Sequence, residues 1–169
     1  IVMVYDPQHT SGDKAETIGL VGKGVTFDTG GLSIKTSAGM YFMKSDMGGA
    51  AAVFGFMEAA ARLQLEKRFI AVVPVTDNLI DATAFKPSDV IQSYSGKTIE
   101  IMDTDAEGRL LLADGLAWLV DHYETDHIVD LATLTGATVR ALGYQAGGLF
   151  SNDDSLASRL SRTGLQCGE

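Results

Sequence analysis

Two segments of the chain gather charged side chains among glycines. The residues of the first segment that could do chemistry are Lys23, Asp28, Lys35 and Asp46. The second segment, residues 103–109, reads DTDAEGR and holds three carboxylates within five positions. Carboxylates this close repel one another unless cations neutralise them. Clusters rich in oxygen ligands suit hard or borderline divalent ions. Taken together, the two segments therefore indicate a divalent metal site.

Taken singly, the same residues have ordinary structural interpretations. Asp105 or Glu107 alone would be an acidic residue that complements the dipole at the start of a helix. Lys23 and Lys35 alone would be solvated, as lysines normally are. Asp28 beside two glycines would be a turn residue. The chemical interpretation depends on both segments meeting in the fold.

The second segment also has the spacing of an EF-hand calcium loop. Asp103, Asp105 and Glu107 are followed by Gly108 at the sixth position and by Asp114 at the twelfth. That motif requires a bidentate Glu at the twelfth position and a helix before the loop, whereas residues 98–102 have the pattern of a strand. A calcium-responsive module stays open as an alternative.

Composition excludes several classes of protein. The chain has 169 residues, 22 of them acidic and 13 basic, so its formal net charge is −9 and it has no general attraction to nucleic acid phosphates. No apolar run approaches the ~20 residues that span a bilayer, so we expect no membrane partner. A single cysteine, Cys167, rules out an internal disulfide framework and a cysteine-rich zinc module. His9 lies in a polar loop without an evident partner.

The elements that must position the charged segments alternate between strands and helices. We expect strands at residues 1–5, 16–22, 68–75, 90–94, 98–102, 128–132 and 149–150. We expect helices at residues 47–65, 108–122 and 153–162, and long loops at residues 22–39 and 77–89. This order predicts an α/β fold with a largely parallel, mixed sheet. Ligands in such folds bind beyond the carboxyl ends of the strands, and both charged segments follow predicted strands.

Four longer motifs resemble those of a known family. VGKGVTFDTGGLSIK, KSDMGGAA, DTDAEGRLLLADGL and DLATLTGA resemble, in order and spacing, the motifs of the leucyl aminopeptidase (M17) family of dinuclear metallopeptidases. The resemblance runs from about residue 18 to residue 150. Asp103 stands where the family's signature octapeptide begins with Asn, and Thr29 where the family usually has Ser.

The resemblance implies a three-layer α/β/α sandwich around a mixed, largely parallel sheet. Residues 1–169 would be part of a catalytic domain, because the family has a separate N-terminal domain and further catalytic-domain sequence. Members are cytoplasmic and usually hexameric. Their substrates are peptides with a free N-terminus, from which they remove a leucine-type residue.

The resemblance also assigns roles to single residues. One metal ion would be held by Lys23, Asp28, Asp46 and Glu107, and the other by Asp28, Asp105 and Glu107, with help from the backbone carbonyl of Asp105. The ions would be Mn or Zn, with Mg or Co as further options. A water between the two ions would be the nucleophile. A lysine can be a ligand only as the neutral amine, the form that nearby dications and burial favour.

Further roles follow from the same matching. Lys35 would polarise the scissile carbonyl, and Arg109 would hold a bicarbonate ion as general base. The substrate pocket would include Met43, Thr133, Leu134 and Gly136. Two functions from other classes stay open beside this one, a metal-binding fragment without turnover and the calcium module described above.

Overall fold

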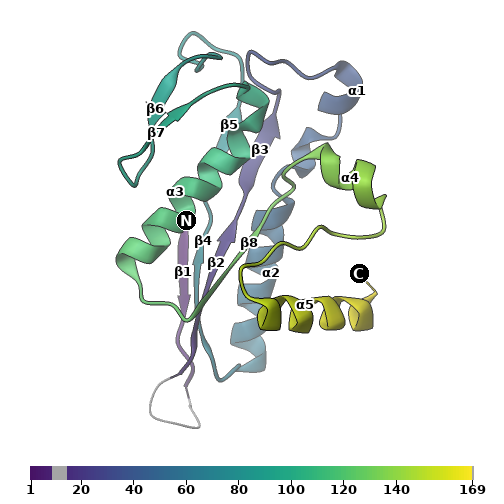
Figure 1. Ribbon diagram of the computed structural model, residues 1–169. Coiled ribbons are helices and arrows are strands. Elements are labelled where there is room, and N and C mark those ends of the chain that lie inside the picture. Colours follow the sequence, from purple (N-terminus) through teal and green to yellow (C-terminus); the bar gives the residue numbers. More distant parts are fainter. Residues whose placement is uncertain (9–14, 169) are drawn as a thin grey trace. The chain divides into compact units, whose positions relative to one another are not determined.

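A computed structural model describes residues 1–8 and 15–168 (Figure 1). His9 and the rest of its predicted loop up to residue 14 lie outside the described residues. The chain divides into two compact units, Ile1–Leu134 and Thr135–Glu169. The first unit contains all the strands found among the described residues, together with both long charged segments. We describe each unit by itself.

A four-stranded mixed sheet forms the centre of the first unit. Its strands are ordered β1 (Val2–Tyr5), β4 (Arg68–Val72), β2 (Thr17–Gly22) and β8 (His127–Leu131). β4, β2 and β8 run parallel, whereas β1 pairs with β4 in the antiparallel direction. β4 has the sequence RFIAV, an apolar run typical of a strand covered on both faces. The prediction of a largely parallel, mixed sheet is therefore confirmed.

One long helix covers each face of this sheet. Leu20, Phe69 and Ala71 share a buried cluster with Val53, Met57 and Ala60 of α2 (Gly48–Leu63). Their neighbours along the strands point the other way, and Val21, Ile70 and Val72 share a second cluster with Leu112 and Leu119 of α3 (Glu107–His122). Because side chains alternate along a strand, the two clusters lie on opposite faces. The unit is the expected α/β/α arrangement (Figure 1).

The start of α2 lies directly against the backbone of β8. A Cβ atom at Gly49 would lie 2.0 Å from the carbonyl oxygen of Leu131, so only glycine permits this approach. The close contact at Gly49 fixes the start of α2 against β8, which is an edge strand of the sheet.

Two small sheets complete the first unit. β3 (Gly24–Asp28) pairs in parallel with β5 (Val75–Asn78), and β6 (Val90–Gln92) forms an antiparallel hairpin with β7 (Thr98–Glu100). Both strands of this hairpin were expected. β3 and the short helix α1 (Ser37–Met40) were not, because residues 22–39 were predicted to be a loop. The predicted strand 68–75 is divided between β4 and β5 at Pro74, which has no backbone N–H for a ladder.

The second unit contains two helices, α4 (Gly136–Leu142) and α5 (Asp154–Cys167). The Asp153 carboxylate accepts hydrogen bonds from the amides of Ser155 and Leu156, so Asp153 is the N-cap of α5. One element was missed and one expectation was wrong. α4 was not predicted, and residues 149–150 form no strand; the Phe150 side chain is 92% exposed. In the described part of the chain, no helix combines the length and the apolar character that crossing a bilayer requires.

Candidate metal centre

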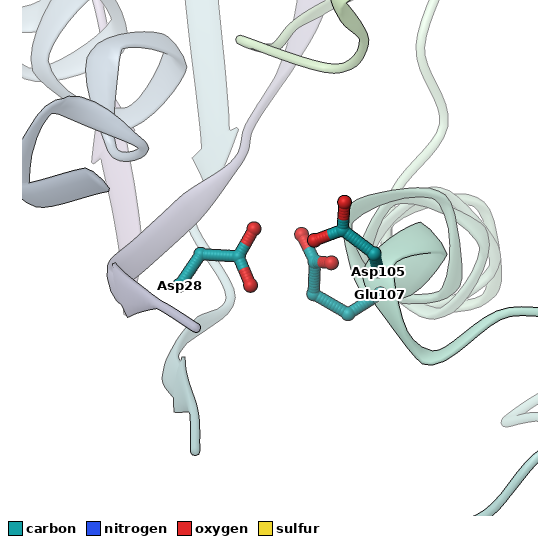
Figure 2. Close-up of side chains that lie close together, drawn as sticks. All are labelled: Asp28, Asp105 and Glu107. Carbon is teal, nitrogen blue, oxygen red and sulfur yellow. The ribbon is translucent and has the colours of Figure 1, made fainter. Parts of the chain in front are cut away.

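Three carboxylates meet where β3 ends and α3 begins. Asp28 is the last residue of β3, Asp105 lies in the short helix η2 (Thr104–Ala106), and Glu107 is the first residue of α3. One oxygen atom from each carboxylate lies within 4.8 Å of the others. Figure 2 shows the three side chains facing one another across the gap between the strand end and the helix start. The two charged segments of the sequence are thus brought together.

Lys23 lies between β2 and β3 and organises one part of the site. Its Nζ atom lies 2.8 Å from Asp46 Oδ1 and 2.9 Å from Glu107 Oε1, and it donates to the Thr133 carbonyl oxygen at 3.0 Å. The Thr133 hydroxyl donates to Asp46 Oδ1 at 2.8 Å. We call Lys23, Asp46, Glu107 and Thr133 the Lys23 group. Its three charged side chains are at most 7% exposed, so the prediction that Lys23 alone would be solvated is wrong.

Lys35 organises the other part of the site. Its Nζ atom lies 2.8 Å from Asp28 Oδ2 and 2.5 Å from Asp105 Oδ1. We call Lys35, Asp28 and Asp105 the Lys35 group. The Lys35 side chain is 17% exposed and that of Asp105 is 33% exposed. Solvent therefore reaches this part of the site, whereas the three charged side chains of the Lys23 group are buried.

Burial and pairing act on the acidity of these groups in opposite directions. Burial raises the pKa of Asp105 and of Glu107 above the ordinary values, despite the lysine paired with each. Burial also pushes the pKa of Asp28 upwards, but hydrogen bonds from Lys35, the Gly30 amide and Asn78 outweigh it and hold that pKa below its usual value. Burial lowers the pKa of Lys35, and its two carboxylate partners overcome this and raise it.

The donor set fits divalent cations. Asp28, Asp46, Asp105 and Glu107 carry two more negative charges than Lys23 and Lys35 can balance. The Asp46 Oδ2 atom is buried and accepts no hydrogen bond from any described residue. An unpaired buried carboxylate oxygen is costly unless a cation compensates it. A hard or borderline divalent ion supplies that charge and prefers such oxygen ligands.

The geometry does not fit an EF-hand. The segment before Asp103 is the strand β7, where an EF-hand requires a helix. Asp114, at the twelfth position, accepts a hydrogen bond from the Tyr94 amide at 2.8 Å. Asp103 accepts one from the Asp105 amide at 2.9 Å and thereby caps η2. Asp105 and Glu107 instead cluster with Asp28, which lies far away in the sequence.

Two buried polar residues at the centre were not predicted. The Asn78 amide donates to Asp28 Oδ1 and to the Thr104 carbonyl oxygen, and it lies 3.4 Å from Glu107 Oε2. The Thr104 hydroxyl donates to the Gly30 carbonyl and accepts from the Ser33 amide, both at 2.7 Å. Asn78 lies in a stretch expected to be a loop, where Asn is an ordinary turn residue. The only feature of the sequence that could have drawn attention to Thr104 was its position between two acidic residues.

The remaining predicted residues lie as follows. Arg109 is an exposed residue of α3 and forms no ion pair with any described residue. Met43 is half-buried and begins the short helix η1 (Met43–Ser45), which leads directly to Asp46. Leu134 is 40% exposed and follows Thr133 of the Lys23 group. Gly136 is the first residue of α4, in the second unit.

Comparison with known proteins decides the family. The profile described as cytosol aminopeptidase family, catalytic domain, matches residues 1–169. The chain belongs to the cytosol aminopeptidase family. Its members are metal-dependent, which agrees with the carboxylate cluster. The resemblance found in the four sequence motifs is therefore confirmed.

Relatives in this family match nearly the whole chain. A probable cytosol aminopeptidase of Chlorobium luteolum is 59% identical over 99% of this chain and 32% of its own length. The leucyl aminopeptidase of Trypanosoma brucei, solved with bestatin, superposes with a TM-score of 0.93 at 38% identity, covering 99% of this chain and 32% of that one. The bottromycin maturation enzyme BotP, solved with Mn, superposes with a TM-score of 0.91 at 44% identity, covering 99% of this chain and 36% of that one. The chain thus spans about a third of the length of these family members.

Proposed function

We propose that this chain carries the reaction centre of a metal-dependent aminopeptidase, which removes the N-terminal residue, of leucine type, from peptides. The observation that carries the proposal is the meeting of Asp28, Asp105 and Glu107 from separate segments, with one oxygen from each within 4.8 Å of the others. The excess negative charge and the buried, unpaired Asp46 oxygen support it. Membership of the cytosol aminopeptidase family supplies the reaction class.

The ligand sets that we propose take residues from both lysine groups and share Asp28 and Glu107. One ion would be held by Lys23, Asp28, Asp46 and Glu107, and the other by Asp28, Asp105 and Glu107, with the Asp105 carbonyl oxygen assisting. Carboxylates shared between two ions are typical of hydrolases that use a metal pair. When bound, the ions would make a water acidic enough to attack a peptide carbonyl near neutral pH. Lys23 would serve as a ligand in its neutral form.

The other side chains would act on the substrate. Lys35 is the more solvent-accessible of the two lysines, so its ammonium can stabilise negative charge that develops on the carbonyl oxygen. Arg109 has no acidic partner among the described residues and would hold a bicarbonate ion that accepts a proton. Met43, Thr133, Leu134 and Gly136 would line the pocket for the N-terminal side chain.

Several finer features belong to the proposal. The ions would be Mn or Zn, with Mg or Co as alternatives, because all four tolerate carboxylate and amine ligands. BotP, solved with Mn, is one family member that supports manganese. The enzyme would be cytoplasmic, as the name cytosol aminopeptidase of its relatives suggests, and would assemble as a homo-oligomer, a hexamer by resemblance to the family.

The proposal is tested by the metal content of the full-length gene product. The protein is equilibrated with Mn²⁺ or Zn²⁺, desalted and analysed, and hydrolysis of a leucine anilide is measured on the same sample. Two ions per chain together with hydrolysis support the proposal. In Asp105→Asn, metal content and hydrolysis should both fall, because the second ion loses an anionic ligand.

The other outcomes contradict the proposal in different ways. Two bound ions without hydrolysis of any N-terminal residue would identify a non-catalytic metal-binding protein. Retention of Ca²⁺ alone would favour a calcium module despite the strand before Asp103. Full metal content and activity in Asp105→Asn would overturn the ligand assignment.

A further inference from the structure

Asn78 is the one neutral side chain that contacts carboxylates from both charged segments among the described residues. It is the last residue of β5, and in the parallel ladder it lies opposite Asp28, the last residue of β3. Its side chain is buried, at 5% exposure. Its Nδ2 atom lies 2.8 Å from Asp28 Oδ1, 3.0 Å from the Thr104 carbonyl oxygen and 3.4 Å from Glu107 Oε2.

The orientation of this amide is chemically fixed. All three neighbours of Nδ2 are acceptors, so a flipped amide would set its oxygen against two carboxylates and a carbonyl. Backbone bonds hold the residue in place, because the Asn78 carbonyl oxygen accepts from the Thr29 amide at 2.9 Å and from the Thr29 hydroxyl at 2.8 Å. Asn78 is therefore rigid at its backbone and at its side chain.

The contacts of Asn78 join every segment that supplies the three clustered carboxylates. Asp28 ends β3, Thr104 directly precedes Asp105 in η2, and Glu107 begins α3. An NH₂ group has two hydrogens, so the two shorter contacts use them, and the contact with Glu107 is the weakest of the three. The chain thus uses one neutral donor to hold the end of a strand against the start of a helix.

A neutral amide suits this place better than a charged donor. A third lysine would repel the cations that the carboxylates are there to bind. The amide nitrogen stabilises the carboxylates in their anionic form and does not compete as a ligand. Groups that hydrogen-bond metal ligands from behind set their orientation, and their loss typically weakens metal binding ~10–100-fold.

We propose that Asn78 is a positioning residue, which sets the separation of Asp28 and Glu107 and prepares them to bind two divalent ions. This inference rests on the proposed function, because it assumes that the carboxylates hold metal. In this role Asn78 would contact neither ion nor substrate. Its effect is exerted through the two carboxylates that it orients.

The test is Mn²⁺ binding to the full-length, metal-free gene product with Asn78→Leu, a change of similar shape that removes both N–H groups. Mn²⁺ binding should weaken by ~10–100-fold, and half-maximal hydrolysis of a leucine anilide should require correspondingly more Mn²⁺. The KM for the anilide at saturating Mn²⁺ should stay the same. The thermal unfolding of the metal-free protein is recorded alongside.

Ser93→Ala is the matched control. Ser93 is also buried, and its hydroxyl bonds to the Lys97 carbonyl oxygen in the β6–β7 hairpin, away from the carboxylates. The Ser93→Ala substitution should lower the melting temperature of the protein and leave its affinity for Mn²⁺ unchanged. If Asn78→Leu does not fold, Asn78→Ser carries the test, since its shorter hydroxyl cannot span both carboxylates.

Two failures are distinguishable. If the wild-type protein binds two Mn²⁺ ions and a folded Asn78 variant binds them within twofold of wild type, the positioning role is overturned and the proposed function stands. If the wild-type protein binds no Mn²⁺ and no other divalent ion, the proposed function fails, and the role of Asn78 fails with it.

Discussion

The two lysine groups of the site have the same plan and different surroundings. In each, one ammonium lies between two carboxylates at 2.5–2.9 Å. The charged side chains of the Lys23 group are at most 7% exposed, whereas Lys35 is 17% and Asp105 is 33% exposed. Identical pairing chemistry therefore operates in a closed environment and in an open one.

The difference in exposure leads us to expect different roles for the two groups. A buried charge without a partner is strongly destabilising, so the Lys23 group must stay compensated at all times, by its own lysine or by a metal ion. The Lys35 group can exchange partners with solvent and with an incoming substrate at lower cost. We therefore expect the buried charges of the Lys23 group to depend more strongly on a compensating cation, and the more accessible Lys35 ammonium to be the one that reaches a substrate, while Asp28 and Asp105 beside it remain proposed metal ligands.

Lys23→Met gives the largest expected loss of stability. It leaves Asp46 and Glu107 buried without their cation, and breaking a buried pair in this way costs about 3–5 kcal/mol. The free energy of unfolding of the metal-free, full-length protein, measured in urea, should fall by that amount. The double variant Lys23→Met, Asp46→Asn removes one of the stranded charges and should be less destabilised. An equal loss in both proteins would mean that the charge of Asp46 is not what Lys23 compensates.

Lys35→Met should show the reverse profile, with a small loss of stability and a large loss of rate. When the ammonium is removed, water can solvate Asp105, and the Gly30 amide and Asn78 still donate hydrogen bonds to the buried Asp28 carboxylate, so the free energy of unfolding should fall by less than in Lys23→Met. The rate constant for leucine anilide hydrolysis should fall by ~10²–10³-fold, the usual effect of removing an oxyanion donor. Metal content per chain should stay at two. A variant that lost its metal instead would place Lys35 among the ligands and remove the contrast between the groups.

Gly108→Ala probes how tightly the closed group is packed. A Cβ atom there would lie 2.7 Å from Lys23 Cε and 2.8 Å from Lys23 Nζ, and Lys23 is held by its own partners. Overpacking of this kind costs about 1–3 kcal/mol. Gly55→Ala in α2 is the control, because its Cβ would meet no atom within 4 Å and alanine favours a helix by about 0.5–1 kcal/mol. Thermal unfolding should therefore shift in opposite directions, and a shift in the same direction would refute the packing argument.

The sequence predicted the large sheet and its two helices because their signals are local. The apolar run of β4 and the helical spacing around Leu112 and Leu119 are visible without any tertiary partner. β3 was missed because it lies in a stretch, residues 22–39, that is rich in Gly, Ser and Thr like a loop, and because its partner β5 lies about 50 residues away. α4 was missed because it begins GATV, a weak helix sequence, although Thr135 before it was a usable capping signal.

The candidate site was predicted in its residue types and not in its internal contacts. The acidic run at residues 103–107 and the lysines around Asp28 were visible, and family motifs supplied their roles. The family motifs already implied that Lys23, Asp46 and Glu107 lie together, but neither signal indicates that Lys35 pairs with Asp28 and Asp105. Asn78 could not be found at all, because a single asparagine acquires its meaning from the acceptors that the fold places around it.

The smallest expected effect belongs to an exposed lysine–carboxylate pair, Lys67 and Glu16, whose side chains are 45% and 35% exposed. The hydrogen bond from Lys67 outweighs burial and lowers the pKa of Glu16 in the folded protein. The pair therefore adds stability at pH values above the pKa of Glu16 in the unfolded chain, and that stability is lost as the pH falls through the lowered pKa in the folded protein.

Glu16→Gln should accordingly reduce the free energy of unfolding by no more than about 1 kcal/mol at pH 7, and by nothing once the carboxylate is protonated. Both proteins are compared in a His127→Gln background, because His127 Nε2 lies 3.5 Å from Glu16 Oε1. If Glu16→Gln cost as much at pH 7 as Lys23→Met, pairing alone would set the energy of these contacts. Burial would then no longer explain why the Lys23 group and the Lys35 group have different tasks.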